Sequence, residues 1–522
     1  MNLLDLEYKM KKYQLPAQLL SLTIFMVLAL LIWQGNKGFN LWDEGFLWYG
    51  VQRVMLGEVP IRDFMAYDPG RYYWSASLMS LWGDNGIIAL RSAVVAFQAM
   101  GLFVGLLLIA RTVKKQNFLY LLLSAVTLTV WMFPRHKLFD IALSILLIGV
   151  LTFLIQSPTN RRYFFAGLCV GLVAVFGRNH GMYGVAGSIG VMFWLNIQRS
   201  EGPGLIKGIV LWGLGVTSGY SPILFMALLV SNFAPPFLDS IRFLFEVKAT
   251  NLPLPVPWPW LVNINSEPLG EAIRGVLVGL FFIGIIIFGV LSIVWVFWQR
   301  YQNKHVSSAL VATSFLALPY AHYAYSRADV GHLAQGIFPL LVGCLVILSS
   351  QPAKIKWPLA LVLCTASLWV MHVFHPGWRC HISNKCVNVT ISGSNLQVNP
   401  GTANDIRLLR NLADEYAPED QSFIATPFWP GAYALLERKS PMWEIYALFP
   451  RSQDFEKAEI ERIKTAKPKF SFVFDLPLDG RDELRFQNTH PLIHQYILDN
   501  FELLPNSPKP SYQIYKERVG TQ

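Results

Sequence analysis

Charged residues are scarce in this chain. Only 15% of its 522 residues are Asp, Glu, Lys or Arg, whereas 53% are hydrophobic. One globular core cannot use so many apolar side chains, which argues against an ordinary soluble domain. The sequence also has no tandem repeat and no low-complexity segment, so neither a repeat architecture nor a compositionally biased chain is indicated.

Acidic residues are scarcer than basic ones, and the formal net charge is +10. The basic residues do not alternate with aromatic residues in the manner of a nucleic-acid-binding surface. We therefore predict no nucleic-acid partner. The positive charge lies instead mainly in short loops between the predicted membrane spans.

Long apolar runs dominate the sequence up to about residue 374, and they are long enough to cross a bilayer. The first is followed by WQGNKGFN rather than by a small-residue cleavage site, so it is a retained span and not a signal peptide. About eleven spans are predicted, at 17–33, 86–110, 118–133, 140–156, 163–177, 182–196, 208–230, 273–298, 307–325, 333–350 and 357–374. Several are shorter than the roughly 20 residues that a span prefers, so a re-entrant short pair is the alternative.

Short basic loops alternate with these spans. This is the positive-inside pattern, and with an odd number of spans it predicts a cytoplasmic N-terminus and an extracytoplasmic C-terminus. The protein should therefore be a multi-pass protein of the plasma or inner membrane. The basic residues on the predicted cytoplasmic side are Arg111, Lys114, Lys115, Arg161, Arg162, Arg199, Lys207, Arg300, Lys304, Lys354 and Lys356.

Composition changes after residue 375, and residues 376–522 are polar enough to fold in water. SFIAT and KFSFVFD predict short buried strands, and three segments with helical periodicity lie around them: DIRLLRNLADEYA, DFEKAEIERIKTA and THPLIHQYILDNF. The predicted fold is a polytopic α-helical membrane domain, residues 1–375, followed by a small extracytoplasmic α/β domain, residues 376–522.

Cysteine is also rare. Two of the five cysteines, Cys380 and Cys386, fall in the predicted outer domain, where an oxidising compartment lets them pair. A metal site with His375 and His381 is the less favoured alternative. The other three, which lie within predicted spans and are expected to act as small hydrophobic residues, are Cys169, Cys344 and Cys364. Asn388 begins a glycosylation sequon, which has meaning only in a eukaryotic secretory pathway.

Residues 41–74, LWDEGFLWYGVQRVMLGEVPIRDFMAYDPGRYYW, follow the first span directly. Asp43 and Glu44 are adjacent carboxylates where a membrane helix should meet water. A charge costs several kcal/mol in lipid and little at its edge. The pair therefore indicates chemistry or ion binding, although a solvated loop with interfacial Trp and Tyr anchors is the alternative.

Further polar clusters fall on predicted outer turns, namely PRHKLFD at 134–140, GRNHG at 177–181 and SRADVGH at 326–332. The first outer loop, 34–85, and the long Pro- and Trp-rich loop, 231–272, lie on the same side. Each cluster also has a structural alternative: Asp140 can cap the following helix, and the others can anchor the interface, bridge helices or form ion pairs. Together they predict one polar site on the outer face.

An enzyme outside the cytoplasm has little ATP and no pool of nucleotide sugars. A sugar carried on a polyprenyl phosphate is an activated substrate that reaches this face through the membrane. Its transfer needs a carboxylate that takes a proton from the acceptor hydroxyl. It also needs cations for the departing phosphate, a role that suits Arg.

Trp42-Asp43-Glu44-Gly45 after the first span, followed by GEVPIRDF and YDPGRYYW, resembles the first outer loop of GT-C membrane glycosyltransferases, in particular bacterial aminoarabinose transferases and protein O-mannosyltransferases. The resemblance covers residues 15–375. It implies that Asp43 is the base, with Glu44 beside it, and that Asp140 is the second acidic residue before the fourth span. The chain has Asp-Pro-Gly-Arg where nearer relatives have Pro-Pro, which leaves the role of Asp68 and the acceptor open.

The predicted function is therefore transfer of a sugar from a polyprenyl-phosphate donor to a lipid, glycan or protein acceptor, with inversion at the anomeric carbon. The predicted catalytic residues are Asp43, Glu44 and Asp140. The predicted substrate-binding residues are Asp68, Arg71, Tyr72, Arg135, His136, Lys137, Arg178, His180, Arg327, Asp329 and His332.

No cofactor is required by this prediction, although the three acidic residues can supply oxygen ligands to Mg²⁺ or Mn²⁺. Residues 376–522 are expected to position the acceptor or to cover the site. Three alternatives remain: a polysaccharide polymerase or ligase centred near 231–272 or 326–332, a transporter with mid-membrane ionisable residues, and a scaffold protein with a receptor-like outer domain.

Overall fold

The computed structural model describes residues 3–113, 117–197, 202–248, 251–383 and 385–518. Lys114, Lys115 and Arg199, used above for the topology, lie outside these residues. The chain forms two compact units, each made from separate stretches of sequence. The helical unit consists of Met1–Gly35, Val94–Met226 and Pro253–Trp378. The mixed unit consists of Asn36–Ala93, Ala227–Leu252 and Arg379–Gln522.

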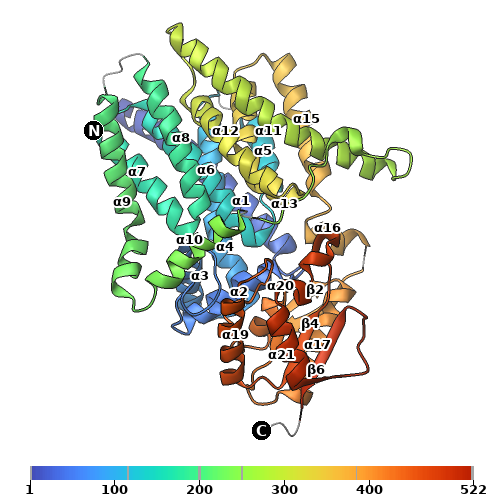
Figure 1. Cartoon of the computed structure of the whole chain (residues 1–522). Helices are drawn as coiled ribbons and strands as arrows, with labels where there is room; N and C mark the ends of the chain where they lie inside the picture. The colour runs from blue at the N-terminus through green and yellow to red at the C-terminus, as the bar shows by residue number, and fades with distance from the viewer. Residues whose placement is uncertain (1–2, 114–116, 198–201, 249–250, 384, 519–522) are drawn as a thin grey trace. The chain divides into compact units, whose positions relative to one another are not determined.

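Helices account for nearly all regular structure up to residue 383 (Figure 1). They are α1 (Leu3–Gln34), α2 (Asp43–Met55), α3 (Pro69–Trp82), α4 (Ile87–Ala110), α5 (Phe118–Val130), η1 (Arg135–Lys137), α6 (Leu138–Gln156), α7 (Asn160–Phe176), α8 (Arg178–Asn196), α9 (Leu205–Leu229), α10 (Ala234–Val247), η2 (Pro259–Leu261), α11 (Leu269–Tyr301), α12 (Ser308–Ser326), α13 (Val330–Gly336), α14 (Phe338–Ser349), α15 (Ala353–Met371) and α16 (Pro376–Ser383).

Each predicted span falls on a helix or, for 333–350, on the bent pair α13 and α14. In the described part of the chain, six helices are long and apolar enough to cross a membrane, or seven if that pair forms one span. Eleven spans are therefore not confirmed. The helices that meet the criterion are Gln14–Gln34, Ile87–Ala110, Arg135–Gln156, Leu205–Leu229, Leu269–Tyr301 and Ala353–Met371.

Exposed apolar side chains lie on several of these helices. Phe25 is 65% exposed on α1, Leu228 78% on α9 and Leu291 62% on α11. Large apolar surfaces of this kind are unusual in water and ordinary in lipid. They support an integral membrane protein, in agreement with the low charge content of the sequence.

Small residues bring helices of the helical unit into close contact. Gly167 and Gly171 on α7 face the backbone of α9, and Gly215 and Gly219 on α9 face the backbone of α7. This is the four-residue spacing by which membrane helices approach closely. At the centre of the unit, α12 packs against α6, α8, α11 and α14. This packing brings together the first turns of α6 and α8, where predicted site residues lie.

The two predicted outer loops contain helices rather than irregular chain. Residues 34–85 include α2 and α3, and 231–272 includes α10 and η2. Pro69 begins α3 and Pro235 lies in the first turn of α10, positions where the missing N–H of proline costs nothing. The second loop therefore contains regular helix despite its Pro-rich composition.

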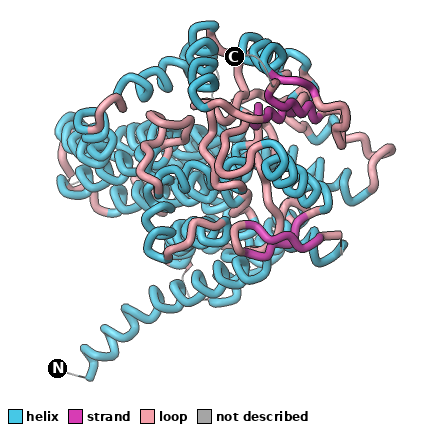
Figure 2. The backbone as a smooth tube through the Cα atoms, turned by 90° about the horizontal axis from the view of Figure 1, so that it is seen from below, coloured by secondary structure: helices cyan, strands magenta, loops and turns pink. Residues whose placement is uncertain are grey.

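The C-terminal residues of the mixed unit contain all strands of the described chain, which form two separate groups (Figure 2). The order β3-β4-β6-β5 forms a four-stranded sheet, and β1 and β2 form an antiparallel hairpin. The elements are β1 (Val387–Ile391), β2 (Ser394–Val398), α17 (Pro400–Tyr416), β3 (Ile424–Thr426), α18 (Pro430–Leu435), α19 (Gln453–Ala466), β4 (Phe470–Phe474), η3 (Leu478–Gly480), η4 (Asp482–Leu484), α20 (Phe486–Thr489), α21 (Pro491–Asn500), β5 (Phe501–Leu503) and β6 (Tyr512–Glu517).

Both predicted strands and all three predicted helices of this region are confirmed as β3, β4, α17, α19 and α21. Strands β3 and β4 run parallel, as a strand–helix–strand unit requires. Strands β5 and β6 were not predicted, and β6 pairs antiparallel with both β4 and β5. The sheet is therefore mixed.

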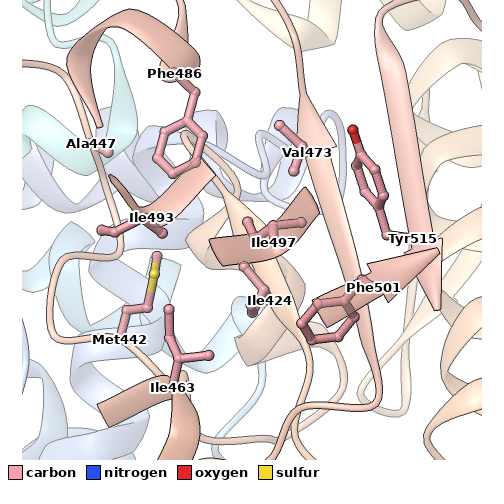
Figure 3. Close-up of a cluster of buried hydrophobic side chains, with 10 residues drawn as sticks. All are labelled: Ile424, Met442, Ala447, Ile463, Val473, Phe486, Ile493, Ile497, Phe501 and Tyr515. Carbon is pink, nitrogen blue, oxygen red and sulfur yellow. The ribbon is translucent and has the colours of Figure 1, made fainter. Parts of the chain in front are cut away.

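A cluster of buried apolar side chains lies against this sheet (Figure 3). It joins Ile424 and Val473 from the central strands to Ile493 and Ile497 on α21. The irregular stretch between α18 and α19 also contributes, through Met442 and Ala447, to the same cluster (Figure 3). The core therefore fixes a stretch that has no regular structure of its own.

Cys380 and Cys386 form a disulfide, as predicted. The alternative, in which the two cysteines bind a metal with His375 and His381, is wrong because a disulfide sulfur is not a thiolate ligand.

Candidate functional site

Asp43 and Glu44 form the first turn of α2, which begins at Asp43. The side-chain oxygen of Asn40 accepts hydrogen bonds from the backbone N–H groups of Trp42 and Asp43, at 2.7 and 3.1 Å. Two carboxylates at a helix N-terminus are also favoured by the helix dipole. The sequence therefore starts a helix at the acidic pair.

The two carboxylates have different surroundings. Glu44 is buried, and Arg91 on α4 donates to both of its oxygens, from Nε to Oε1 and from Nη2 to Oε2, each at 2.8 Å. Arg91 also donates to the carbonyl oxygen of Gly38 at 2.7 Å. Both oxygens of Glu44 are therefore held in a buried bidentate ion pair.

Asp43 is only half-buried. Its Oδ1 accepts a hydrogen bond from the hydroxyl of Tyr446, at 3.0 Å, although 403 residues separate the two in sequence. The Tyr446 ring lies 5.6 Å from that of Phe46 on the next turn of α2. A partly accessible carboxylate with a fixed neighbour is suited to accept a proton from a hydroxyl group.

Phe46 also connects this carboxylate to the predicted YDPGRYYW stretch. Its ring lies 4.8 Å from that of Tyr67, and the guanidinium of Arg71 lies over Tyr67 at 4.8 Å from the centroid. Asp68, half-buried, precedes the first residue of α3. Tyr72 has no exposed surface, and its hydroxyl accepts the backbone N–H of Tyr67 at 2.9 Å. Tyr72 is therefore a core residue in this structure.

In the helical unit, Asp140 lies in the first turn of α6 and is buried. Its Oδ1 lies 3.0 Å from Nε2 of His180, which is in the first turn of α8. This distance is that of an ion pair, but the two atoms are not aligned for a hydrogen bond. Nδ1 of His180 is 2.9 Å from the Tyr320 hydroxyl on α12. Nζ of Lys137 lies 4.0 Å from Oδ2 of Asp140. Two of the predicted polar turns therefore meet here.

The third predicted turn joins the same cluster through aromatic rings. His180 lies 5.4 Å from Tyr323, and Tyr323 lies 5.9 Å from His332, centroid to centroid. Asp329 caps α13 by accepting the backbone N–H of His332 at 2.8 Å, and its side chain also contacts the His332 ring at 2.9 Å. Nε of Arg327 donates to Asp329 at 3.0 Å. Burial would raise the pKa of Asp329, but its contacts with His332 and Arg327 outweigh this and lower it.

Three further predicted residues lie near these turns. Arg135 donates from Nη1 to the carbonyl oxygen of Gln34 at 3.0 Å, and His136 is buried in the same short helix η1. Arg178 begins α8 and is half-buried. In the described residues, no group of three or more His, Cys, Asp or Glu side chains forms a set that could hold a metal ion.

The predicted site residues thus fall into two groups. The mixed unit holds the acidic pair and the YDPGR stretch, and the helical unit holds the three polar turns around Asp140, His180 and His332. Sequence reasoning missed Arg91, although an arginine near the start of an apolar span was a visible signal. It also missed the YAHYAYS sequence that ends α12 and supplies Tyr320 and Tyr323. No sequence signal pointed to Tyr446.

The described chain combines long apolar helices with a small mixed sheet near the C-terminus. ArnT from Cupriavidus metallidurans, in a structure with bound undecaprenyl phosphate, has this fold: the TM-score is 0.54, the identity 11%, and the match covers 97% of this chain and 99% of that chain. The apo structure of the same protein gives a TM-score of 0.52 at 12% identity, over 96% and 98% of the two chains.

An oligosaccharyltransferase from Archaeoglobus fulgidus also matches, with a TM-score of 0.47 and 11% identity over 96% of this chain and 74% of that chain. No protein-family model and no curated protein matches the sequence. The resemblance proposed from the sequence therefore agrees with the fold of ArnT.

Proposed function

We propose that this protein transfers a sugar from a polyprenyl-phosphate donor to a hydroxyl-bearing acceptor at the extracytoplasmic face of a membrane. The observation that carries the proposal is the contrast at the start of α2. Glu44 is fully engaged by Arg91, whereas Asp43 is half-exposed and held by Tyr446. The whole-length likeness to ArnT, whose structure holds undecaprenyl phosphate, supports the choice of donor class.

In the proposed reaction the acceptor oxygen attacks the anomeric carbon of the sugar. A new carbon–oxygen bond forms as the bond between that carbon and the phosphate oxygen breaks. The acceptor proton passes to Asp43, and the polyprenyl phosphate leaves with its electron pair. Attack opposite the leaving group inverts the anomeric configuration, in line with the function predicted from the sequence.

We propose that Lys137 and Arg327, two cations of the helical unit, bind the donor phosphate. Lys137 lies next to Asp140, and Arg327 lies next to Asp329, so each is oriented by a carboxylate near a helix start. Such cations bind phosphate oxygens through charge-assisted hydrogen bonds. Asp140 and His180 are proposed to position this cluster, with His332 as a further donor to the phosphate. Arg71 is buried, with its guanidinium over the Tyr67 ring, and is therefore a less favourable candidate than the sequence suggested.

The placement of ionisable residues supports an enzyme over a transporter. Asp43, Asp140 and His180 all lie in the first turn of a helix. A transporter typically carries its ionisable residues near the middle of broken helices. Carboxylates at helix starts are suited to chemistry at the edge of a membrane instead.

The test is sugar transfer by the purified protein in nanodiscs. The probes are undecaprenyl phosphates that carry a labelled hexose or pentose, offered with lipid, glycan and peptide acceptors in the presence of Mg²⁺, Mn²⁺ or a chelator. Release of undecaprenyl phosphate and an inverted product are expected. Asp43→Asn should reduce the rate about 10²–10⁴-fold, because it removes the base and keeps the shape.

A matched control is Asp405→Asn on α17, whose carboxylate also accepts a hydrogen bond from a tyrosine, Tyr512, at 2.9 Å. This variant should transfer sugar at the wild-type rate. Wild-type turnover by a folded Asp43→Asn protein would remove Asp43 from the mechanism. If no donor is turned over by the wild-type protein, the proposed donor class is wrong.

A further inference from the structure

Residues 440–451, here called the 440–451 segment, contain Tyr446, whose hydroxyl contacts the proposed base. We infer that Tyr446 is a positioning residue for Asp43, and that the C-terminal part of the chain therefore contributes directly to the catalytic site. This inference rests on the proposed function and deepens it. The expectation that residues 376–522 only position an acceptor or cover the site would then be too narrow.

The contact itself is specific. The Tyr446 hydroxyl donates to Oδ1 of Asp43 at 3.0 Å, and the ring is half-buried between Phe46 at 5.6 Å and Phe428 at 6.0 Å. Rings on two sides limit the rotation of the tyrosine. A hydroxyl held in this way fixes the direction in which the carboxylate points.

Backbone hydrogen bonds fix the segment at several points. The N–H of Ser440 donates to the Tyr49 hydroxyl at 3.0 Å, and the N–H of Ala447 donates to the carbonyl oxygen of Pro427 at 2.9 Å. Trp443 contacts the stretch after α2 twice: its indole N–H donates to the carbonyl oxygen of Ile61, and its own carbonyl accepts the N–H of Met65, both at 2.9 Å.

Two buried carboxylates also hold the segment. Oε2 of Glu459 accepts the backbone N–H groups of Trp443 and Glu444, at 2.8 and 3.2 Å. The Glu444 side chain is itself bound by Arg451 at 2.7 Å and by His490 at 2.8 Å. Buried carboxylates with this many partners are rigid, because any movement would leave a charge without a partner.

Apolar packing completes the support. Met442 and Ala447, on either side of Tyr446, are both buried in the cluster beneath the sheet (Figure 3). The guanidinium of Arg451 lies 3.6 Å from the centroid of the Phe243 ring on α10. The segment is therefore a rigid irregular stretch, and its one half-buried tyrosine at this position faces the proposed base.

Rigid support for the base has a catalytic consequence. A general base works only when it lies within hydrogen-bond reach of the acceptor hydroxyl and in the correct direction. Small displacements of a catalytic group reduce rates strongly. Tyr446 should therefore affect the chemical step, through the orientation of Asp43, more than it affects donor binding.

The test is a double-mutant cycle with Tyr446→Phe and Asp43→Asn, read by single-turnover release of undecaprenyl phosphate from the donor that the wild-type protein uses. Tyr446→Phe alone should lower kcat about 10- to 100-fold, as expected for loss of a hydrogen bond to a charged group, with KM almost unchanged. In the Asp43→Asn background the same change should have little further effect, because Tyr446 acts through that carboxylate.

Tyr512→Phe is the matched control, since the Tyr512 hydroxyl also donates to an aspartate, Asp405, at 2.9 Å. This variant should leave kcat unchanged.

If Tyr446→Phe lowered the rate equally in the wild-type and the Asp43→Asn proteins, its role would be purely structural and the inference would be overturned. Wild-type kcat for Tyr446→Phe would overturn it as well. If Asp43→Asn lowers the rate but Tyr446→Phe does not, only this inference fails. If neither variant changes the rate, the proposed base fails as well. Melting temperatures of the variants verify that each protein is folded.

Discussion

At the scale of single residues, helix geometry separates two adjacent carboxylates. Consecutive residues of a helix point about 100° apart. Glu44 therefore turns inward to Arg91, while Asp43 keeps a partly exposed side chain next to Tyr446. Two residues with the same chemistry and neighbouring positions thus acquire a structural and a proposed catalytic role.

The Glu44–Arg91 pair gives a prediction about stability. Arg91→Met should lower the free energy of unfolding by about 3–5 kcal/mol, because buried Glu44 loses the guanidinium that neutralises its charge. The double variant Glu44→Leu, Arg91→Met removes both charges and should be less destabilised. The measurement is thermal or denaturant unfolding in detergent. A single variant as stable as wild type would indicate that the pair is not buried in solution.

The Glu444 side chain gives a prediction about pH. Burial alone would raise the pKa of Glu444, but the hydrogen bond from His490 and the charge of Arg451 outweigh it and hold the pKa below its usual value of 4.5. The folded state therefore binds this proton less readily than the unfolded state does. The resulting stability is present above about pH 4.5 and is lost as the pH falls through the folded-state pKa.

Glu444→Gln should accordingly reduce the unfolding free energy at pH 7 and show a weaker loss between pH 5 and 3 than the wild-type protein. Unfolding curves across this pH range are the measurement. Glu461→Gln, which alters an exposed carboxylate on α19, is the control and should follow the wild-type curve. A parallel pH dependence for Glu444→Gln and wild type would contradict the assignment.

At the scale of elements, α2 and α18 cross through two glycines. A Cβ atom added at Gly431 would lie 2.7 Å from the carbonyl oxygen of Leu41 and 3.1 Å from Cα of Gly45. The N–H of Gly431 donates to that same carbonyl oxygen, at 2.8 Å. The start of α2, and with it Asp43, is thus set by a backbone contact that only glycine permits.

Gly431→Ala should therefore destabilise the protein by about 1–3 kcal/mol and lower the rate of sugar transfer, since the backbone must move at the start of α2. Gly213→Ala on α9 is the matched control, because no atom lies within 4 Å of the added Cβ. It should be neutral or slightly stabilising, as alanine is the better helix former. Melting temperature and turnover are measured for both variants, and equal behaviour would contradict the close crossing.

At the scale of the whole molecule, both units combine distant parts of the sequence. The mixed unit joins the stretch after α1 and the stretch around α10 to the C-terminal sheet. The first predicted outer loop therefore folds with residues that lie more than 300 positions later in the chain. A fragment that ends before residue 379 should lack Tyr446, the partner of Asp43, and Trp443, the partner of Ile61.

The predicted topology is tested by cysteine labelling of intact cells. A cysteine at Glu461, exposed on α19, should react with a membrane-impermeant reagent. A cysteine at Arg161, exposed at the start of α7, should react only with a permeant reagent. Equal labelling of the two positions by the impermeant reagent would contradict a cytoplasmic N-terminus with an extracytoplasmic C-terminal region.

The sequence by itself determined the features that depend on local composition. About 20 apolar residues are needed to cross a bilayer, and lipid requires every backbone group to bond within its own helix, so these helices are visible without any tertiary information. Helices α17, α19 and α21 follow instead from the 3.6-residue periodicity of their apolar residues. The GT-C resemblance came from the local motifs in residues 41–74.

Only the tertiary structure decided what the polar residues do. Arg91 neutralises Glu44, and Tyr446 holds Asp43 across 403 residues. Three separate turns meet at His180, which contacts Asp140 directly and His332 through Tyr323. Periodicity records which way a side chain faces within its own element, but not which distant element lies opposite. The pairing of a carboxylate with an arginine, a tyrosine or a histidine is therefore fixed by packing, and it is this pairing that distinguishes a buried structural acid from a candidate base.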